Sequence, residues 1–360
     1  MSTINNLDFR VRRDDHSICE SVPAPAAEPE PGQIAVKIDA FALTANNITY
    51  ATLGDTLKYW SFFPADEGWG RIPVWGFADV TASNHDDVQV GQRFYGYWPM
   101  SSSLVLQPER VGPNGFTDGI PHRKGLPGLY NSYALTSADP FYDANFEEMH
   151  MVLYPLFGTS FLIADLLREG NPPAAKRLVF SSASSKTAFS SAYMLRESGL
   201  KIVGLTSAGN RDFVQGLGVY DQVVLYDEID SMDASEPVAY VDYAGNASVT
   251  RAIHGRYQDK LVYSLGVGSS HPGKMEPLDD LPGVERTMFF APTYSRKRMK
   301  ALGGPRGMAE AMVAGWKSYR ETASQWINIS RGSGPEAVQK VYLDMLQGRA
   351  KPDQGYVLSL

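Results

Sequence analysis

The segment from Leu178 to Ala188 turns an apolar strand into a helix through a run of serines and one lysine. An apolar stretch over 177–180 predicts the strand, and a helix-period run over 187–197 ends before Gly199, a residue that commonly terminates helices. A second apolar stretch, 201–206, predicts another strand. This order is a βαβ unit of about thirty residues, the span over which a dinucleotide-binding crevice is built.

The loop lacks the glycines with which most dinucleotide-binding turns approach a pyrophosphate. Ser182, Ser184 and Ser185 stand there instead, and their hydroxyls can donate hydrogen bonds to phosphate oxygens. The helix N-terminus, with Lys186 and Thr187, adds positive potential and a further hydroxyl. We therefore interpret the loop as a phosphate-binding turn.

Two alternatives remain open for this loop. Its lysine and threonine match the end of a P-loop, but Phe180 and Ser185 occupy the two glycine positions of that motif. It is also compatible with an ordinary strand-to-helix turn in which a serine caps the helix.

The end of the second strand indicates which dinucleotide fits. An NAD site usually has an acidic residue about twenty residues after the loop, where it binds the ribose 2′-OH. Here the strand ends with Thr206 and Ser207, followed by Asn210 and Arg211, and no acid is present. Hydroxyl, amide and guanidinium groups suit a 2′-phosphate, so NADP(H) is predicted as the cofactor. Arg211 is equally compatible with a solvated helix residue.

Two later turns belong to the same predicted edge. Ligands in open α/β sheets bind outside the carboxyl ends of the strands. The residues expected to line the ribose and nicotinamide follow two such strands and are Asp242, Gly245, Asn246, Ser264, Leu265 and Gly266. The alternative is simple turn chemistry at strand ends.

Strand and helix patterns divide the chain into three blocks. Alternating strands and Pro/Gly turns up to about residue 150 predict barrel-like β structure. From residue 151 a helix, expected from about Pro155 to Arg168, precedes six strands in a β-α rhythm, which predicts a doubly wound parallel sheet. The last segments alternate helix, strand, helix and strand and are expected to return to the first domain.

Composition excludes several classes of protein. A net charge of −7 argues against nucleic-acid binding, and the basic run Arg296, Lys297, Arg298 with Lys300 fits a solvated helix face better than an anion-binding patch. We find no eighteen-residue apolar run and no leader pattern, so we expect a cytoplasmic protein with no membrane partner. The single cysteine, Cys19, excludes an intrachain disulfide and any zinc site built from several cysteines.

The chain resembles the medium-chain dehydrogenase/reductase superfamily, on its zinc-free quinone reductase and enoyl reductase side. The resemblance rests on the opening strand and asparagine turn at 31–47, the segment Pro73 to Val80, the hairpin Val90 to Gly96 and the closing strand Gly355 to Leu360. The resemblance covers nearly the whole chain. It lies in the order of the strands and turns more than in identical residues. The departures, among them the serine loop, an aromatic stretch at 57–75 and an unusual segment at 291–299, point to a poorly characterised branch.

The resemblance implies a fold and a domain division. The fold is α/β, with a GroES-like β-barrel catalytic domain and a Rossmann domain that holds a doubly wound six-stranded parallel sheet. The catalytic domain is expected over 1–150 and 296–360, and the Rossmann domain over 151–295. The superfamily also implies a homodimer.

No metal site is expected. Phe77 and Ala78 stand where zinc-dependent members have His-Glu, and the six histidines show no ligand spacing. Charge that develops on a substrate oxygen would then need hydrogen-bond donors instead.

Candidate donors lie in the segment 46–50, which in related reductases faces the nicotinamide. Tyr50 is predicted as the proton donor or oxyanion partner, with Thr49 and Asn47 positioning the substrate. The alternative for Tyr50 is a packed residue whose hydroxyl is satisfied locally.

An aromatic group of Tyr59, Trp60, Phe62 and Phe63 is predicted to form the wall of a substrate site for a flat or apolar small molecule. These side chains also suit a core or a dimer contact.

The sequence thus predicts a zinc-independent, NADP(H)-dependent oxidoreductase that transfers hydride to or from an enone, quinone or carbonyl. Two alternatives stay open. One is a lyase that uses bound NADP for redox-assisted cleavage, and the other is a nucleotide-binding protein without turnover, which the glycine-poor loop favours.

Overall fold

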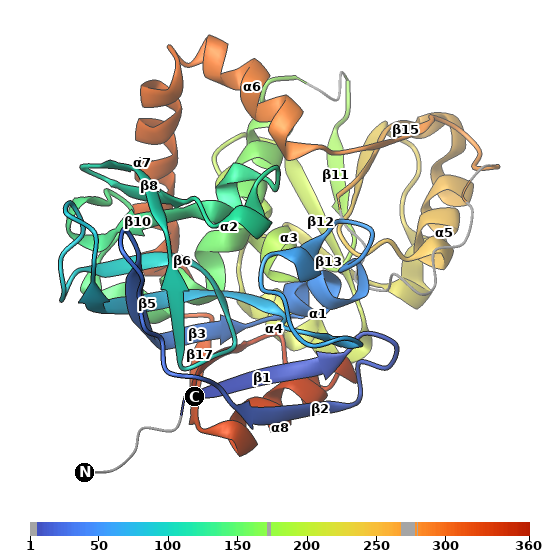
Figure 1. Cartoon of the computed structure of the whole chain (residues 1–360). Coiled ribbons are helices and arrows are strands. Elements are labelled where there is room, and N and C mark those ends of the chain that lie inside the picture. Colours follow the sequence, from blue (N-terminus) through green and yellow to red (C-terminus); the bar gives the residue numbers. More distant parts are fainter. Residues whose placement is uncertain (1–5, 171–173, 268–277, 279) are drawn as a thin grey trace. The chain divides into compact units, whose positions relative to one another are not determined.

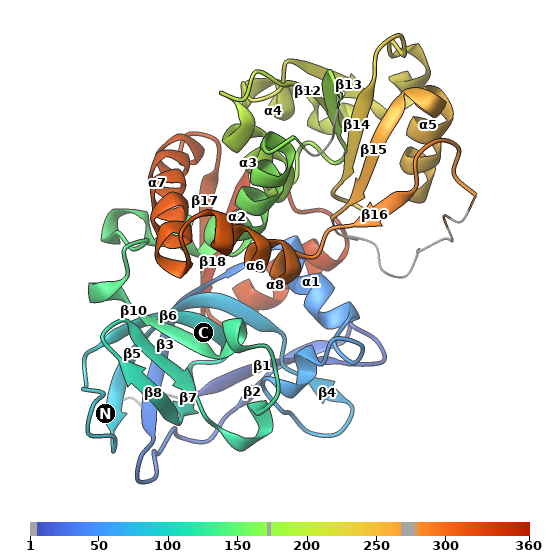
Figure 2. The same ribbon diagram turned by 90° about the horizontal axis from the view of Figure 1, so that it is seen from above.

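The computed structural model describes residues 6–170, 174–267, 278 and 280–360. The chain divides into two compact units (Figures 1 and 2). Unit 1 comprises Met1–Val152 and Ile327–Leu360, and unit 2 comprises Leu153–Trp326.

Unit 2 contains a six-stranded sheet in the strand order β13-β12-β11-β14-β15-β16. Every neighbouring pair is parallel. The order reverses at β11, which is the topology of a doubly wound Rossmann sheet and confirms the predicted fold class. The strands are β11 (Arg177–Phe180), β12 (Lys201–Thr206), β13 (Gln222–Leu225), β14 (Val238–Asp242), β15 (Leu261–Gly266) and β16 (Arg286–Met288).

Both faces of this sheet are buried, as a parallel sheet requires. Leu178 and Phe180 of β11 pack on one face with α2 and α3, while Val179 between them packs on the other face with α5. Figure 2 shows α3 and α5 on opposite sides of these strands. The helices are α2 (Glu147–Arg168), α3 (Lys186–Leu195), α4 (Arg211–Gly216), α5 (Ala247–Tyr257), α6 (Ala291–Ala301) and α7 (Pro305–Ala323), with short 3₁₀ turns η6 (Ala208–Asn210), η7 (Tyr226–Ser231) and η8 (Gln258–Lys260).

Unit 1 is built from a nine-stranded mixed sheet and a three-stranded antiparallel sheet, β2-β1-β4. In the larger sheet β3 pairs with β5 on one side, and on the other side its first half pairs with β7 and its last residues with β18. Only Gln107 separates β7 from β8, so the path from β3 through β5, β6, β10, β9 and β8 returns to β3 through β7 and closes the sheet. The strands are β1 (Leu7–Arg12), β2 (Cys19–Pro23), β3 (Ile34–Leu43), β4 (Trp69–Gly70), β5 (Pro73–Ser83), β6 (Arg93–Pro99), β7 (Ser103–Leu106), β8 (Pro108–Gly112), β9 (Gly115–Asp118), β10 (Ser132–Leu135), β17 (Asn328–Ser333) and β18 (Gln354–Ser359). This is the GroES-like arrangement that the sequence predicted.

Two helices belong to unit 1, α1 (Ala45–Thr52) and α8 (Pro335–Leu346). Helix α8 packs beside β1 and β2 (Figure 1), where the ring of Tyr342 lies 5.4 Å from that of Phe9. The Tyr342 hydroxyl donates to the backbone oxygen of His16 at 2.7 Å. The C-terminal segments 327–360 are therefore part of the same core as the first strands.

Helix α2 begins at Glu147, before the predicted start at Pro155, which lies inside the helix. The prediction was wrong because proline costs one backbone hydrogen bond, whereas the apolar residues on both sides, such as Val152 and Phe157, are fully buried and stabilise the helix through it. Among the described residues, α2 is also the one helix with the length and apolar composition to cross a membrane. Because 67% of its most apolar window is buried, core packing accounts for that composition.

The chain returns to unit 1 at Ile327 rather than at residue 296, so α6 and α7 lie in unit 2. A buried polar contact explains why α6 belongs to unit 2. The Arg298 side chain, only 13% exposed, donates to the Asp165 carboxylate of α2 at 3.0 Å, and the Tyr294 hydroxyl donates to the same carboxylate at 2.8 Å. Arg298 thus connects α6 to α2 through a buried ion pair and is not part of a solvated face. Arg296, Lys297 and Lys300 are exposed.

Candidate functional site

A buried carboxylate, Asp242 at the end of β14, holds the carboxyl edge of the parallel sheet together. Its side chain is fully buried. It accepts hydrogen bonds from the Ser181 hydroxyl at 2.8 Å, from the backbone amides of Ala244 at 3.2 Å and Gly245 at 3.0 Å, and from the Thr250 hydroxyl at 3.3 Å. It also forms an ion pair with Arg286 of β16 at 3.0 Å. Asp242 therefore links the carboxyl ends of β11 and β14 to α5 and to Arg286, the first residue of β16.

The serine loop has the backbone conformation of a glycine turn. Ser182 has φ 49°, in the left-handed region where glycine is the usual residue. Its backbone amide donates to the Tyr226 hydroxyl of η7 at 3.1 Å. Ser185 caps α3, because its hydroxyl accepts from the amide of Ala188 at 3.3 Å, and Lys186 and Thr187 begin the helix. The loop lies tightly against β12, since a Cβ placed on Gly204 would come within 2.8 Å of the Ala183 side chain.

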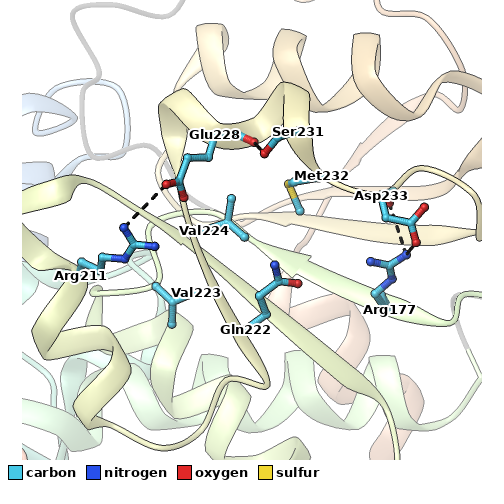
Figure 3. A pocket seen from close by; sticks show the side chains of 9 residues that line it. All are labelled: Arg177, Arg211, Gln222, Val223, Val224, Glu228, Ser231, Met232 and Asp233. Atoms are coloured by element: carbon cyan, nitrogen blue, oxygen red, sulfur yellow. Dashed lines mark hydrogen bonds and ion pairs between the residues drawn. The ribbon is translucent and has the colours of Figure 1, made fainter.

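The loop and the end of β12 lie side by side. The Asn210 amide donates to the Ser184 hydroxyl at 3.1 Å, and Ser207 is exposed. Thr206 is 1% exposed, and its hydroxyl has no hydrogen-bond partner among the residues described. Arg211 begins α4 and forms an ion pair with Glu228 of η7 at 3.7 Å (Figure 3). The structure thus brings the predicted phosphate-binding residues to one edge.

The two later turns use most of their side chains internally. Asn246 caps α5 by accepting from the amides of Ser248 and Val249. The Ser264 hydroxyl is buried and lies 2.9 Å from Nε2 of His254, whose Nδ1 lies 2.9 Å from the carbonyl oxygen of Pro282. Burial lowers the pKa of His254, so the imidazole is neutral, with Nδ1 donating to that carbonyl and Nε2 accepting from Ser264.

In the turns after β14 and β15, the groups without such side-chain contacts belong to the backbone. Gly245 has φ 70°, a conformation that suits glycine, and it brings the chain close to the sheet edge. Leu265 and Gly266 end β15 and are buried. The side chains of Asp242, Asn246 and Ser264 make internal contacts, and the prediction that these turns line the ribose and nicotinamide stays a prediction.

Three residues at this edge were missed by sequence reasoning. Tyr226 and Glu228 follow β13, and Arg286 lies in β16. Their positions depend on which strands are neighbours in the sheet. The available signal was the position of Tyr226 and Glu228 at and just after the end of the third strand, predicted over 222–226, because in this topology that strand ends beside β12.

In unit 1, Tyr50 lies on α1 and is 5% exposed. Its hydroxyl accepts from the Asn46 amide at 2.7 Å and from the Trp75 indole at 3.4 Å. Burial raises the pKa of Tyr50 to about 12, and these two donors only partly oppose that shift. The phenol is therefore protonated at neutral pH.

The neighbours of Tyr50 on α1 have different environments. Asn47 is 2% exposed, and its side chain accepts from the backbone amide of Thr44 at 2.7 Å and donates to the Pro73 carbonyl at 2.8 Å. It therefore fixes the start of α1 against β5. Thr49 is half-buried.

The residues of the predicted aromatic wall fall into two groups, core residues and members of a cluster of aromatic rings around Tyr50. Trp60 is 3% exposed and fills the space that a Cβ on Gly54 or Gly70 would occupy, and Phe63 is buried beneath the Arg123 guanidinium at 4.4 Å. Both are core residues. Tyr59 is half-buried, and its ring lies 4.6 Å from that of Tyr50. It joins a group of aromatic rings with Phe62, Trp75, Tyr97 and Tyr130.

Comparison with protein families now places the chain. Residues 41–351 match the family described as protein of unknown function (DUF2855). The chain belongs to this family. Among curated proteins, none matches this DUF2855 member.

Solved structures share the fold of this DUF2855 member over their full length. CurA from Vibrio vulnificus in complex with NADPH aligns with a TM-score of 0.65 and 11% identity over 99% of this chain and 98% of that one. The yhdH oxidoreductase from Salmonella enterica in complex with NADP aligns with a TM-score of 0.54 and 12% identity over 98% of this chain and 99% of that one. The quinone oxidoreductase from Coxiella burnetii aligns with a TM-score of 0.54 and 12% identity over 99% of each chain. The DUF2855 member therefore has the medium-chain dehydrogenase/reductase fold, as the sequence resemblance predicted.

Metal ligands do not gather in the part of this DUF2855 protein that the structure describes. There, no group of three or more His, Cys, Asp or Glu side chains is arranged to hold a metal ion. His271 lies outside the described residues.

The buried contacts of Asp242 predict a large effect on stability. Asp242→Ala removes the acceptor for four hydrogen bonds and leaves Arg286, 16% exposed, without its carboxylate. Loss of one partner of a buried pair costs about 3–5 kcal/mol, so the free energy of unfolding measured in urea should fall by that order.

Glu310→Ala is the matched control, because it removes an exposed carboxylate from the Arg306 pair on α7 of the same unit. It should change stability little. Equal effects of the two substitutions would contradict the role assigned to Asp242.

Proposed function

We propose that this protein is an NADP(H)-dependent oxidoreductase that transfers hydride to or from an enone, quinone or carbonyl compound without zinc. The observation that carries the proposal is the carboxyl edge of the parallel sheet, where a left-handed serine turn, the start of α3 and the end of β12 are held next to one another. Two structures with the same fold contain NADPH or NADP.

The donors at this edge fit a phosphorylated dinucleotide. Ser182 adopts the backbone conformation of a glycine, and the buried Thr206 hydroxyl lacks a partner among the described residues, as expected where a ligand completes a site. We assign the pyrophosphate to the loop with Lys186 and Thr187. Ser207, Asn210 and Arg211 would hold the 2′-phosphate, and the backbone at 244–246 and 265–266 would line the ribose and nicotinamide.

When bound, the cofactor supplies or accepts the hydride, and the protein must supply a group that exchanges a proton with the substrate. We assign the proton to Tyr50, whose hydroxyl accepts from Asn46 and Trp75 and would donate its proton to a substrate oxygen. The two N–H groups also stabilise the phenolate that remains after the proton leaves. Phe77 and Ala78 have no ligand atoms, which supports a proton-donating rather than a zinc-assisted mechanism.

Cofactor titration tests the proposal before a substrate is known. Followed by nicotinamide fluorescence and calorimetry, NADPH should bind, and Lys186→Ala should weaken that binding by about 1–3 kcal/mol because a charge-assisted phosphate contact is lost. Lys201→Ala is the control, since Lys201 lies at the opposite, amino end of β12 and pairs with Asp221 at 2.8 Å. If neither NADPH nor NADH binds, the proposed function fails.

Removal of the Tyr50 hydroxyl should affect turnover and not cofactor affinity. With an enone or quinone found by screening, Tyr50→Phe should lower kcat by about 10²-fold to 10⁴-fold. Tyr59→Phe, a matched change in the adjacent ring, should have a much smaller effect. Because burial raises the pKa of Tyr50 to about 12, the donating form persists at any pH below that value. Activity should therefore show no loss from tyrosine ionisation up to about pH 10. An unchanged kcat in Tyr50→Phe would exclude it as the donor.

We further propose that two copies associate through β16, the last strand of the parallel sheet. Among the residues described, no strand pairs with its outer edge, and Met288 and Phe290 there are 60% and 64% exposed. An open edge with apolar side chains favours pairing with another chain. Sedimentation should give twice the mass of one chain, and Met288→Glu with Phe290→Glu should give monomers. A monomeric wild-type protein would contradict this arrangement.

A further inference from the structure

A cavity of about 350 Å³ lies along β13 and beneath η7 in unit 2 (Figure 3). An ion pair stands at each of its two ends. Arg211 pairs with Glu228 at 3.7 Å at one end, and Arg177 pairs with Asp233 at 2.8 Å at the other. The first pair includes the arginine that the proposed function assigns to the 2′-phosphate.

Glu228 is fixed in place by the backbone around it. Its Oε2 accepts a hydrogen bond from the amide of Leu225, the last residue of β13, at 3.0 Å, and its backbone oxygen accepts from the Ser231 hydroxyl at 2.7 Å. The other carboxylate oxygen faces Arg211. The Leu225 amide therefore holds the Glu228 carboxylate beside Arg211.

This placement gives the site an acid that the end of β12 lacks. A 2′-phosphate bound by Arg211 would bring about two negative charges close to the Glu228 carboxylate, and like charges at short range disfavour binding. A ribose 2′-OH carries no charge and can donate a hydrogen bond to a carboxylate. Arg211 therefore favours the phosphorylated cofactor, while Glu228 opposes that preference.

We propose that Glu228 is a specificity-determining residue that holds the preference for NADPH over NADH below the level that Arg211 alone would give. This inference rests on the proposed function, since it concerns the same site. It predicts a protein that binds both dinucleotides, with a ratio of affinities set by the charge of Glu228.

The test measures dissociation constants for NADPH and NADH by calorimetry at low salt. Glu228→Gln removes the charge and keeps an oxygen for the Leu225 amide, so the turn should persist. The ratio of the NADH to the NADPH dissociation constant should rise by about tenfold, mostly through tighter NADPH binding. Because the effect is electrostatic, raising the ionic strength to about 1 M should reduce it.

Asp233→Asn is the matched control. It makes the same charge change in the same cavity, but at the Arg177 end. It should alter the ratio by less than about twofold, because the strand ends that bind the cofactor lie at the other end of the cavity. An equal shift in both variants would show a general charge effect and overturn the inference.

A second variant keeps the test decisive if Glu228→Gln does not fold. Glu228→Ala removes the same charge and should raise the ratio in the same direction, while Arg211→Gln should lower the ratio by weakening NADPH binding alone. If the wild-type protein binds neither dinucleotide, the proposed function fails and the inference with it. If it binds both and Glu228→Gln leaves the ratio unchanged, the inference is overturned while the proposed function stands.

Discussion

The carboxylate of Asp242 is the interaction on which the rest of the candidate cofactor site depends. It is fully buried, and it collects two hydroxyl donors, two backbone amides and one arginine from four separate segments. A buried charge of this kind is tolerated only when it is paired and hydrogen-bonded. The contacts that neutralise Asp242 are therefore the same contacts that fix the ends of β11 and β14, the first residue of β16 and the start of α5.

A fixed edge explains how a glycine-poor loop can serve a dinucleotide fold. Glycine normally supplies the left-handed turn after the first strand, and here Ser182 adopts that conformation at some cost in backbone energy. The surrounding contacts offset the cost, because Ser181 is bonded to Asp242 and the Ser182 amide to Tyr226. The result is a left-handed turn in which serine takes the place that glycine usually has.

Much of the fold could be predicted from the sequence, because parallel strands buried on both faces are short apolar runs between turns. The bounds of β11 and β12 agree with the prediction at both ends. Helix α2 was predicted to start too late, since burial of its apolar residues compensates for Pro155. The return to unit 1 was predicted too early, since the pairing of Arg298 with Asp165 depends on tertiary structure.

The meeting of the predicted segments could be derived from the sequence, whereas the contacts of their side chains could not. The segments that follow β11, β12 and β14 do meet, because the topology requires it. What each side chain does there depends on neighbours that lie far away in sequence. Ser264 is bonded to His254, Asn47 to Pro73, and Arg211 to Glu228. No local pattern shows these pairs.

Hydrogen exchange of the full-length protein with and without NADPH tests the central claim most directly, because it shows where the cofactor binds as well as whether it binds. The account predicts slower exchange in peptides that cover 180–188, 206–211 and 242–246, with little change in β8 and β9 of unit 1. Protection confined to other segments, or none at saturating NADPH, would contradict the assignment of this sheet edge as the dinucleotide site.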